Sequence, residues 1–152
     1  MPAILDRDKL DDKILRELQR DARQSFRDVA RRCSASVATV LSRVRKLEAE
    51  GVIRGYAAIL DAEKLGYDVV AVIELTVSSG KMLEVQREIA KNQNVIAVYD
   101  ATGETDSIVI ARFRGRRELS AFIKDVLRMP NVQRTNTHLV LNIVKEDFRA
   151  RV

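Results

Sequence analysis

The chain has 152 residues, of which 46% are hydrophobic and 32% charged, so it can build one ordinary domain or two small ones and is not compositionally disordered. Lys and Arg outnumber Asp and Glu by 27 to 22, and the net charge of +5 is compatible with an anionic partner. One cysteine and one histidine exclude an internal disulfide, a multi-cysteine zinc site and a histidine-rich metal site, so we expect no metal and no cofactor.

No apolar run approaches the ~18 residues of a membrane span. The first fifteen residues alternate charged with apolar side chains and lack the apolar core of a signal peptide. We therefore expect a cytoplasmic protein without a membrane partner.

The first half of the chain has helical periodicity. The first predicted helix begins near Asp8 and ends near Asp21, and a second runs from about Ser25 to Arg32, with Phe26, Val29 and Ala30 on its inner face. A third helix is expected between a Ser36 cap and Gly51. At 100° per residue its apolar side chains form one stripe, which consists of Val37, Val40, Val44 and Leu47.

The segment from Val52 to Leu60 is strand-like, and the pattern then changes near residues 65–66. Strand-like and helical stretches follow in the order strand 68–77, helix 82–90, strand 95–102, strand 107–113, helix 119–127 and strand 132–144. A weak repeat, KNQNV at 91–95 and RMPNV at 128–132, occupies the helix–strand junction of each half. We predict an α+β protein: an N-terminal helix-turn-helix domain (winged-helix-like) and a C-terminal ferredoxin-like βαββαβ sandwich.

The predicted sheet is antiparallel, with both helices on one face. Its first and third strands are apolar at most positions, so the other face is apolar too. An apolar uncovered face predicts self-association. The alternative is that the first helix or the linker covers this face within one chain.

Two closely spaced helices joined by a tight turn are typical of the helix-turn-helix motif. From Arg23 to Leu47 the chain carries seven cations and one anion, a net charge of +6. Small or hydroxyl side chains early in a recognition helix approach base edges, and cations neutralise phosphates. The candidate DNA-binding residues are Ser36, Ala38, Thr39, Ser42, Arg43, Arg45 and Lys46, with Arg43 on the flank. The alternative is a solvated basic helix face.

The chain resembles the leucine-responsive regulator/asparagine regulator (Lrp/AsnC) family of transcriptional regulators from about Asp8 to Phe148. In the first half the resemblance rests on Asp8-x-x-Asp11-x-x-Ile14-Leu15, Asp21-Ala22-Arg23, Val29-Ala30 and Ser36-x-x-Thr39-Val40-x-x-Arg43-Val44-x-x-Leu47-Glu48-x-x-Gly51-Val52-Ile53. In the second half it rests on Val98-Tyr99, Thr102-Gly103-x-x-Asp106 and Thr135-x-Thr137. Two departures are Ser34-Ala35, where the family usually has Gly-Leu, and Thr105, where it usually has an aromatic residue.

The resemblance implies a DNA-binding domain at 1–52, a strand-containing linker at 53–66 and a ligand-sensing and oligomerisation domain at 67–152. It also implies that an amino acid or a similar effector binds between sensing modules at a subunit interface. The candidate contacts are Gly103, Glu104, Thr105, Asp106, Thr135 and Thr137. The alternative is that residues 103–106 form an ordinary hairpin turn stabilised by the Asp106 carboxylate.

The function expected is a one-component, nucleoid-associated regulator that binds double-stranded DNA as a homodimer, assembles further into an octamer or a similar ring, and responds to an amino acid. Two alternatives remain. Some proteins resembling this family are sirohaem decarboxylases, and such chemistry would rely on His138 and the arginines near 112–117. The other alternative is an architectural protein that coats DNA with little sequence preference. Cys33 is expected to be a buried small residue rather than a redox thiol.

Overall fold

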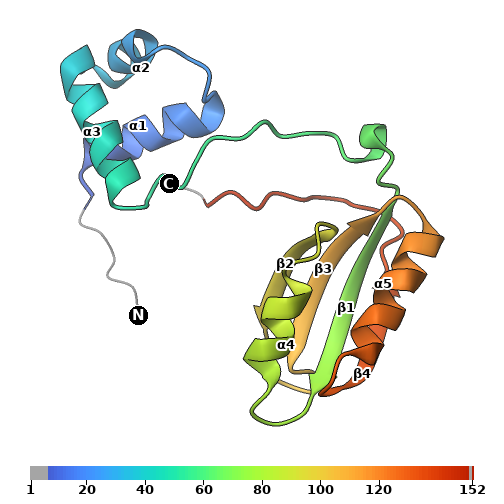
Figure 1. The fold of residues 1–152 in the computed structure, drawn as a ribbon. Coiled ribbons are helices and arrows are strands. Elements are labelled where there is room, and N and C mark those ends of the chain that lie inside the picture. Colours follow the sequence, from blue (N-terminus) through green and yellow to red (C-terminus); the bar gives the residue numbers. More distant parts are fainter. Residues whose placement is uncertain (1–6, 151) are drawn as a thin grey trace. The chain divides into compact units, whose positions relative to one another are not determined.

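The computed structural model describes residues 7–150 and 152; residues 1–6 of the predicted first domain, and residue 151, lie outside it. The chain divides into two compact units (Figure 1). The first holds the described residues up to Ile59 together with those from Asp147 onward, and the second runs from Leu60 to Glu146.

The first unit contains the three predicted helices, α1 (Lys9–Arg20), α2 (Phe26–Cys33) and α3 (Val37–Ala49). Asp8 caps α1 by accepting hydrogen bonds from the main-chain N–H groups of Leu10 and Asp11, and the Asp11 carboxylate accepts from the Asp8 N–H in return. This reciprocal arrangement satisfies donors that an α-helix leaves free at its start. The helices enclose an aliphatic core of Ile14, Leu18, Val29, Ala30, Cys33, Val40 and Val44.

Two residues expected inside this core are partly exposed. Val37 is 44% exposed and Phe26 is 38% exposed. Each is the first residue of its helix, and Val37 lies about 50° away from the middle of the stripe formed by Val40, Val44 and Leu47. The inner face of α3 therefore begins one turn later than the sequence suggests.

The strand expected from Val52 to Leu60 does not form in this chain. Between α3 and a short 3-10 helix, η1 (Glu63–Leu65), the described residues contain no strand. A strand needs a neighbour to pair its main-chain groups, and the segment has none within one chain. Its side chains Tyr56, Ile59 and Leu60 are instead 51%, 81% and 65% exposed.

The second unit has the predicted ferredoxin-like order. Its elements are β1 (Val69–Val77), α4 (Met82–Ile89), β2 (Val95–Asp100), β3 (Ser107–Phe113), α5 (Arg116–Arg128) and β4 (Val132–Leu139). The strands form one antiparallel sheet in the order β2-β3-β1-β4, and both helices lie on the same face (Figure 1). β4 ends at Leu139, five residues before the predicted end at Val144. Its antiparallel partner β1 begins at Val69, so the pairing stops there, and the N–H of Val140 donates the last hydrogen bond to the Val70 carbonyl.

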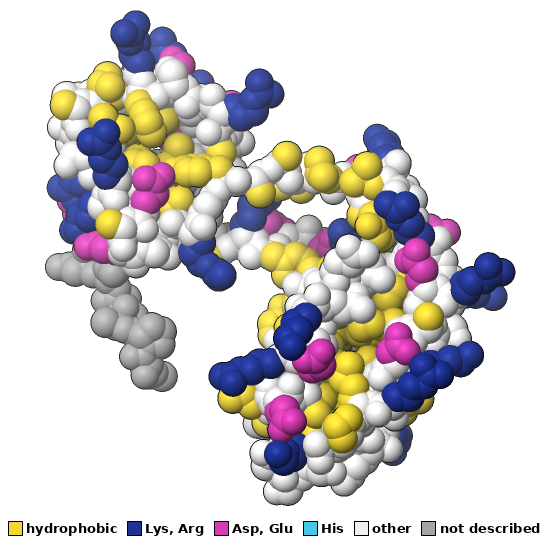
Figure 2. All heavy atoms as spheres, viewed as in Figure 1, with side chains coloured by type: hydrophobic (Ala, Val, Ile, Leu, Met, Phe, Trp, Pro, Cys, Tyr) yellow, Lys and Arg dark blue, Asp and Glu magenta, His cyan; other side chains and the backbone are white. Residues whose placement is uncertain are grey.

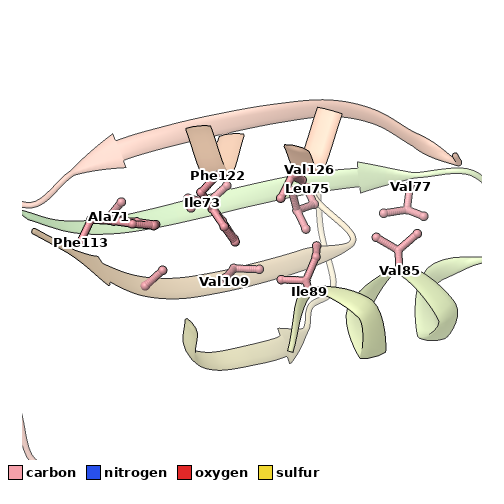
Figure 3. Packing of buried hydrophobic residues seen from close by; sticks show 11 residues of the cluster. Ala71, Ile73, Leu75, Val77, Val85, Ile89, Val109, Phe113, Phe122 and Val126 are labelled. Atoms are coloured by element: carbon pink, nitrogen blue, oxygen red, sulfur yellow. The ribbon is translucent and has the colours of Figure 1, made fainter. Parts of the chain in front are cut away.

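The core of this unit lies between the sheet and its helices. Figure 3 shows Phe122 and Val126 of α5 over Ile73 and Leu75 of β1. The rings of Phe113 and Phe122 pack with their centroids 5.3 Å apart. Alternate residues of β1 and β3 are fully buried here, as period-two strands with one covered face require.

The opposite face of the sheet carries Val70, Val72, Ile108, Ile110 and Tyr99, which the strand register places side by side. Within the described part of this unit no helix covers these side chains, and Tyr99 is 47% exposed. We call these five residues the open face. These apolar residues agree with the prediction from the sequence, but the register also places the charged side chains of Glu74 and Arg112 on this side of the sheet.

The last residues of the chain return to the first unit. The Nε of Arg16 donates a 2.8 Å hydrogen bond to the Val152 carbonyl oxygen, and the side-chain amide of Gln19 donates to the Ala150 carbonyl oxygen. The second unit is therefore connected to the first at both of its ends. The domain boundaries drawn from the sequence did not include this return.

The turn between α2 and α3 contains no glycine. Ser34 adopts the left-handed conformation, with φ 55° and ψ 45°, and the Ala35 N–H reaches back to the Ala30 carbonyl at 3.0 Å. This hydrogen bond is the one that closes a helix C-terminus when the next residue is left-handed. A side chain in that conformation costs about 1–2 kcal/mol relative to glycine.

We predict that Ser34→Gly raises the free energy of unfolding of the first unit by about 1 kcal/mol, because glycine adopts this conformation without steric cost. Urea denaturation of the full chain, followed by helical circular dichroism, measures the change. Ala35→Gly is the matched control and is expected to lower stability. Equal effects of the two substitutions would contradict a left-handed Ser34.

Candidate DNA-binding and effector sites

The outward face of α3 presents the predicted side chains. Ala38, Thr39, Ser42, Arg45 and Lys46 are all exposed, and the core residues Val40, Val44 and Leu47 hold the opposite side of the helix. Figure 2 shows Lys and Arg side chains projecting around the margin of the first unit. The helix thus offers small and hydroxyl groups in its first two turns and cations in the third.

Two hydroxyls fix the start of this helix. The Ser36 Oγ accepts a 3.0 Å hydrogen bond from the Thr39 N–H, and the Ser36 and Thr39 hydroxyls lie 2.8 Å apart. Thr39 therefore serves both as an exposed residue and as the partner of the cap. The Ser-x-x-Thr spacing indicates this pairing, whereas the prediction from the sequence named Ser36 alone as the cap.

Arg43 faces α1 rather than solvent. Its Nη1 lies 2.8 Å from the Asp8 Oδ2 and 3.2 Å from the Asp11 Oδ2, and the Asp11 side chain is only 3% exposed. The negative charge of Asp11, followed by the contact with Asp8, raises the pKa of Arg43. Of the candidate DNA-binding residues, Arg43 is thus already paired within the chain, where it joins α3 to the start of α1.

The remaining cations of this unit differ in whether they form ion pairs with acidic side chains. Arg23, Arg27 and Arg45 form no ion pair among the described residues, whereas Arg31 pairs with Asp28 at 2.7 Å and Lys46 lies 3.9 Å from Glu50. Exposed pairs of this kind contribute little to stability and exchange readily for another anion. Exposed cations of both α2 and α3 are therefore available to contact phosphates.

Beyond the turn that ends α3, a tyrosine side chain attaches the following segment to that helix. The Tyr56 hydroxyl donates a 2.9 Å hydrogen bond to the Glu48 Oε1. Burial, together with the Glu48 carboxylate, raises the pKa of Tyr56 to about 12, so the phenol stays protonated and continues to donate near neutral pH. Neither residue was among the predicted site residues.

The predicted effector turn joins β2 to β3 and is bound to the end of β1. The Asp106 Oδ2 accepts a 2.8 Å hydrogen bond from the Val77 N–H, and the Thr105 hydroxyl donates to the Leu75 carbonyl at 2.8 Å. Gly103 has φ 121°, a region that side chains rarely adopt. Asp106 thus stabilises the turn and keeps its second carboxylate oxygen for another donor.

Thr135 and Thr137 lie across β1 from this turn. Thr135 pairs with Leu75 and Thr137 with Ile73, so both share the helix-covered side of the sheet at its edge. β3 and β4 flank β1 on opposite sides, and two strand spacings separate them by about 10 Å. The structure brings Gly103, Glu104, Thr105 and Asp106 together but does not bring the two threonines into the same cluster within one chain.

The groups proposed for alternative chemistry are dispersed. His138 lies on the exposed side of β4, 3.3 Å from the Glu74 Oε1 and within 3.1 Å of the Asn136 amide nitrogen. Cys33 is buried in the first unit, and that burial raises the pKa of its thiol. Among the described residues no group of three or more His, Cys, Asp or Glu side chains is arranged to hold a metal ion.

Comparison with known proteins identifies both halves. Residues 7–54 match the family model for a winged helix-turn-helix DNA-binding domain, and residues 70–150 match the Lrp/AsnC ligand binding domain. An uncharacterised HTH-type transcriptional regulator of Pyrococcus furiosus is 47% identical over 142 residues, which are 93% of this chain and 96% of that protein. The HTH-type transcriptional regulator FL11 of Pyrococcus horikoshii is 36% identical, over 91% of this chain and 92% of that protein.

Solved structures agree with these relatives. The transcriptional regulator NMB0573 of Neisseria meningitidis, in complex with L-Met, superposes with a TM-score of 0.86 at 29% identity, over 94% of this chain and 95% of that one. AsnC of E. coli superposes with a TM-score of 0.87 at 25% identity, over 94% and 97% of the two chains. These relatives are named as transcriptional regulators, not enzymes. No helix among the described residues is long and apolar enough to cross a membrane.

We predict that Asp11→Ala lowers the free energy of unfolding by about 2 kcal/mol, because it removes a buried carboxylate and leaves the Arg43 guanidinium without that partner. Arg43→Ala is expected to destabilise in the same direction. Urea denaturation in the absence of DNA measures both effects. Arg45→Ala is the matched control and should change stability by no more than about 0.5 kcal/mol; an Arg43→Ala midpoint equal to that of Arg45→Ala would refute the assignment.

Proposed function

Because the chain belongs to the Lrp/AsnC family of transcriptional regulators, we propose that it is a sequence-specific DNA-binding regulator whose DNA binding or assembly responds to an amino acid. The observation that carries the proposal is the exposed face of α3. It is polar and cationic, it begins at a capped turn, and Arg43 holds it in place from behind. A ligand-binding module of the same family follows in the same chain.

In this proposal α3 enters the major groove. Ala38, Thr39 and Ser42 approach the base edges, and the exposed methyl groups of Val37 add an apolar surface suited to a thymine methyl. Arg45 and Lys46 contact phosphates on either side of the groove. Arg43 then contributes by holding the helix rather than by touching DNA, which revises the role expected from the sequence.

The regulator acts as a homodimer in this proposal. The open face of the sheet is apolar, and large exposed apolar patches are typical of subunit interfaces. A dimer formed there carries two helix-turn-helix units and reads a roughly palindromic site with half-sites one helical turn apart. Further assembly into an octamer or a similar ring follows the expectation from the family, and the native mass of the purified protein tests both levels.

In this proposal the effector site is formed by residues of two chains. Within one chain, the Gly103–Asp106 turn offers a carboxylate oxygen for an α-ammonium group, whereas Thr135 and Thr137 lie about 10 Å away across β1. A second sensing module can supply the missing contacts from the other side. The Neisseria neighbour was solved with L-Met, which supports an amino acid as the class of effector. Such a ligand shifts the assembly only if two states bind it with different affinity.

The place of action follows from the partner. A regulator of this kind acts on chromosomal DNA, in the cytoplasm and associated with the nucleoid.

We predict that Arg45→Ala and Lys46→Ala weaken binding to all duplexes alike, and that each lost phosphate contact lowers the slope of log affinity against log salt by about 0.9. Ser42→Ala and Thr39→Val should instead change which sequences are preferred, because their hydroxyls address base edges. Selection from a randomised duplex pool, followed by fluorescence anisotropy at several salt concentrations, measures both properties.

Arg87→Ala, at an exposed cation on α4, is the control for the lost charge. Uniform loss from all four substitutions would contradict base reading by Thr39 and Ser42. A wild-type protein that shows no preference within the pool would support the architectural, DNA-coating alternative.

We predict that Asp106→Asn abolishes the thermal stabilisation that the cognate amino acid gives, while the fold and effector-free DNA binding persist. The amide oxygen still accepts from the Val77 N–H, but the negative charge that would hold an ammonium group is gone. A thermal-shift screen of the wild type against the twenty amino acids identifies the ligand, and the variant is then tested with it. Asp100→Asn, at the end of β2, is the matched control; an unchanged response in Asp106→Asn would exclude Asp106 as a contact.

A further inference from the structure

A group of arginines at the end of β3 has no part in the proposed regulator function. Residues 112–118 contain four arginines and one acid, Glu118. Arg112 lies on β3 and pairs with Glu146. The other three, Arg114, Arg116 and Arg117, are exposed, and we call them the arginine corner.

The positive charges of the arginine corner are not paired with acidic side chains of the described residues. None of its three side chains forms an ion pair with a described residue, and the Glu118 carboxylate is engaged in a 2.9 Å hydrogen bond from the Arg114 main-chain N–H. Arg116 and Arg117 occupy the first turn of α5, where the helix dipole disfavours cations. The stability of the fold therefore does not account for these charges.

One side chain of the corner is held in an orientation suited to binding. The Arg114 guanidinium lies 5.1 Å from the centre of the Tyr67 ring. Such stacking limits the rotamers of a long side chain while leaving its N–H donors free. A planar guanidinium whose donors are free fits a phosphate with two parallel hydrogen bonds.

The position of the corner in the chain relates it to DNA. Tyr67 lies two residues before β1, so the corner stands where the linker from the DNA-binding unit enters the sheet. Fully extended, the linker 53–66 spans at most about 50 Å. One turn of duplex DNA is about 34 Å long. A duplex held by α3 and continuing beyond its half-site is therefore within reach of this end of the second unit.

We propose that the arginine corner binds the phosphate backbone of duplex DNA outside the segment contacted by α3, so that the ligand-binding unit lengthens the DNA footprint. The inference rests on the proposed DNA-binding function. The contact carries no base information, because it involves phosphates alone. It adds affinity only for duplexes that extend past the operator.

The test compares wild type, Arg116→Ala/Arg117→Ala and a control, Arg87→Ala/Lys124→Ala, which removes the same charge from exposed unpaired cations of α4 and α5. Each is titrated with a selected operator of about two helical turns and with the same operator inside about six turns of duplex. We expect the corner variant to bind the short duplex like wild type. On the long duplex we expect its salt slope to fall by about 0.9 per lost phosphate contact and its footprint to shorten.

Two outcomes separate this inference from the proposed function. If wild type binds neither duplex, the regulator proposal itself fails. If wild type binds the short duplex but the corner variant matches the control on the long one, in both slope and footprint, the arginine corner is a solvated charge cluster and this inference alone is overturned. Urea denaturation of the three proteins establishes that the substitutions leave the fold intact.

Discussion

Two ion pairs made by one arginine cross the first unit and join α3 to the start of α1. Arg43 extends from the flank of α3 to the carboxylates of Asp8 and Asp11 at the start of α1. The same two carboxylates form the cap that starts α1. Asp8 and Asp11 therefore both cap α1 and bind Arg43 of α3. The outward-facing residues of α3 take no part in these contacts between the two helices. The side chains on the outer face of α3 can therefore differ without disturbing the contacts that hold the helix.

The second unit separates its two faces in a comparable way. The helix-covered face of the sheet is filled by aliphatic side chains and by Phe113 and Phe122. The five apolar residues of the open face have no covering helix within the described part of the unit, and charged side chains such as Glu74 and Arg112 share their side of the sheet. A strand that is apolar on both sides is typical of a sheet buried on both sides. One chain supplies only half of that burial.

Much of this arrangement could be predicted from the sequence, because periodicity reports burial directly. The three helices of the first unit and the βαββαβ order of the second follow from apolar spacing, and the Ser36 cap follows from residue type. The errors concern features that depend on a neighbour. Val52–Leu60 has the composition of a strand but no partner in the chain, and β4 stops near the residue at which its antiparallel partner β1 begins, although the alternation continues.

The candidate sites show the same limit. The exposure of Ala38, Ser42 and Arg45 follows from their angle on α3, whereas the pairing of Arg43 with Asp11 joins residues 32 positions apart, which no local pattern reveals. The left-handed backbone of Ser34 could not be predicted from the sequence either. The turn requires this conformation, although serine, unlike glycine, adopts it at a steric cost. The residues of the effector turn were identified through the family resemblance, and their hydrogen bonds to β1 became evident only from the fold.

The return of the C-terminus to α1 has a mechanical consequence. A domain joined to another by a single flexible connection can swivel about it, whereas one joined at both ends resists twisting. Here the second unit is inserted in the chain between the helices of the first unit and the C-terminal residues that also belong to that first unit. The side chains of Arg16 and Gln19 donate hydrogen bonds to main-chain carbonyls of these C-terminal residues. A twist of the second unit is thus passed along the chain both to the linker and to the C-terminal segment bound to α1, the helix that Arg43 joins to α3.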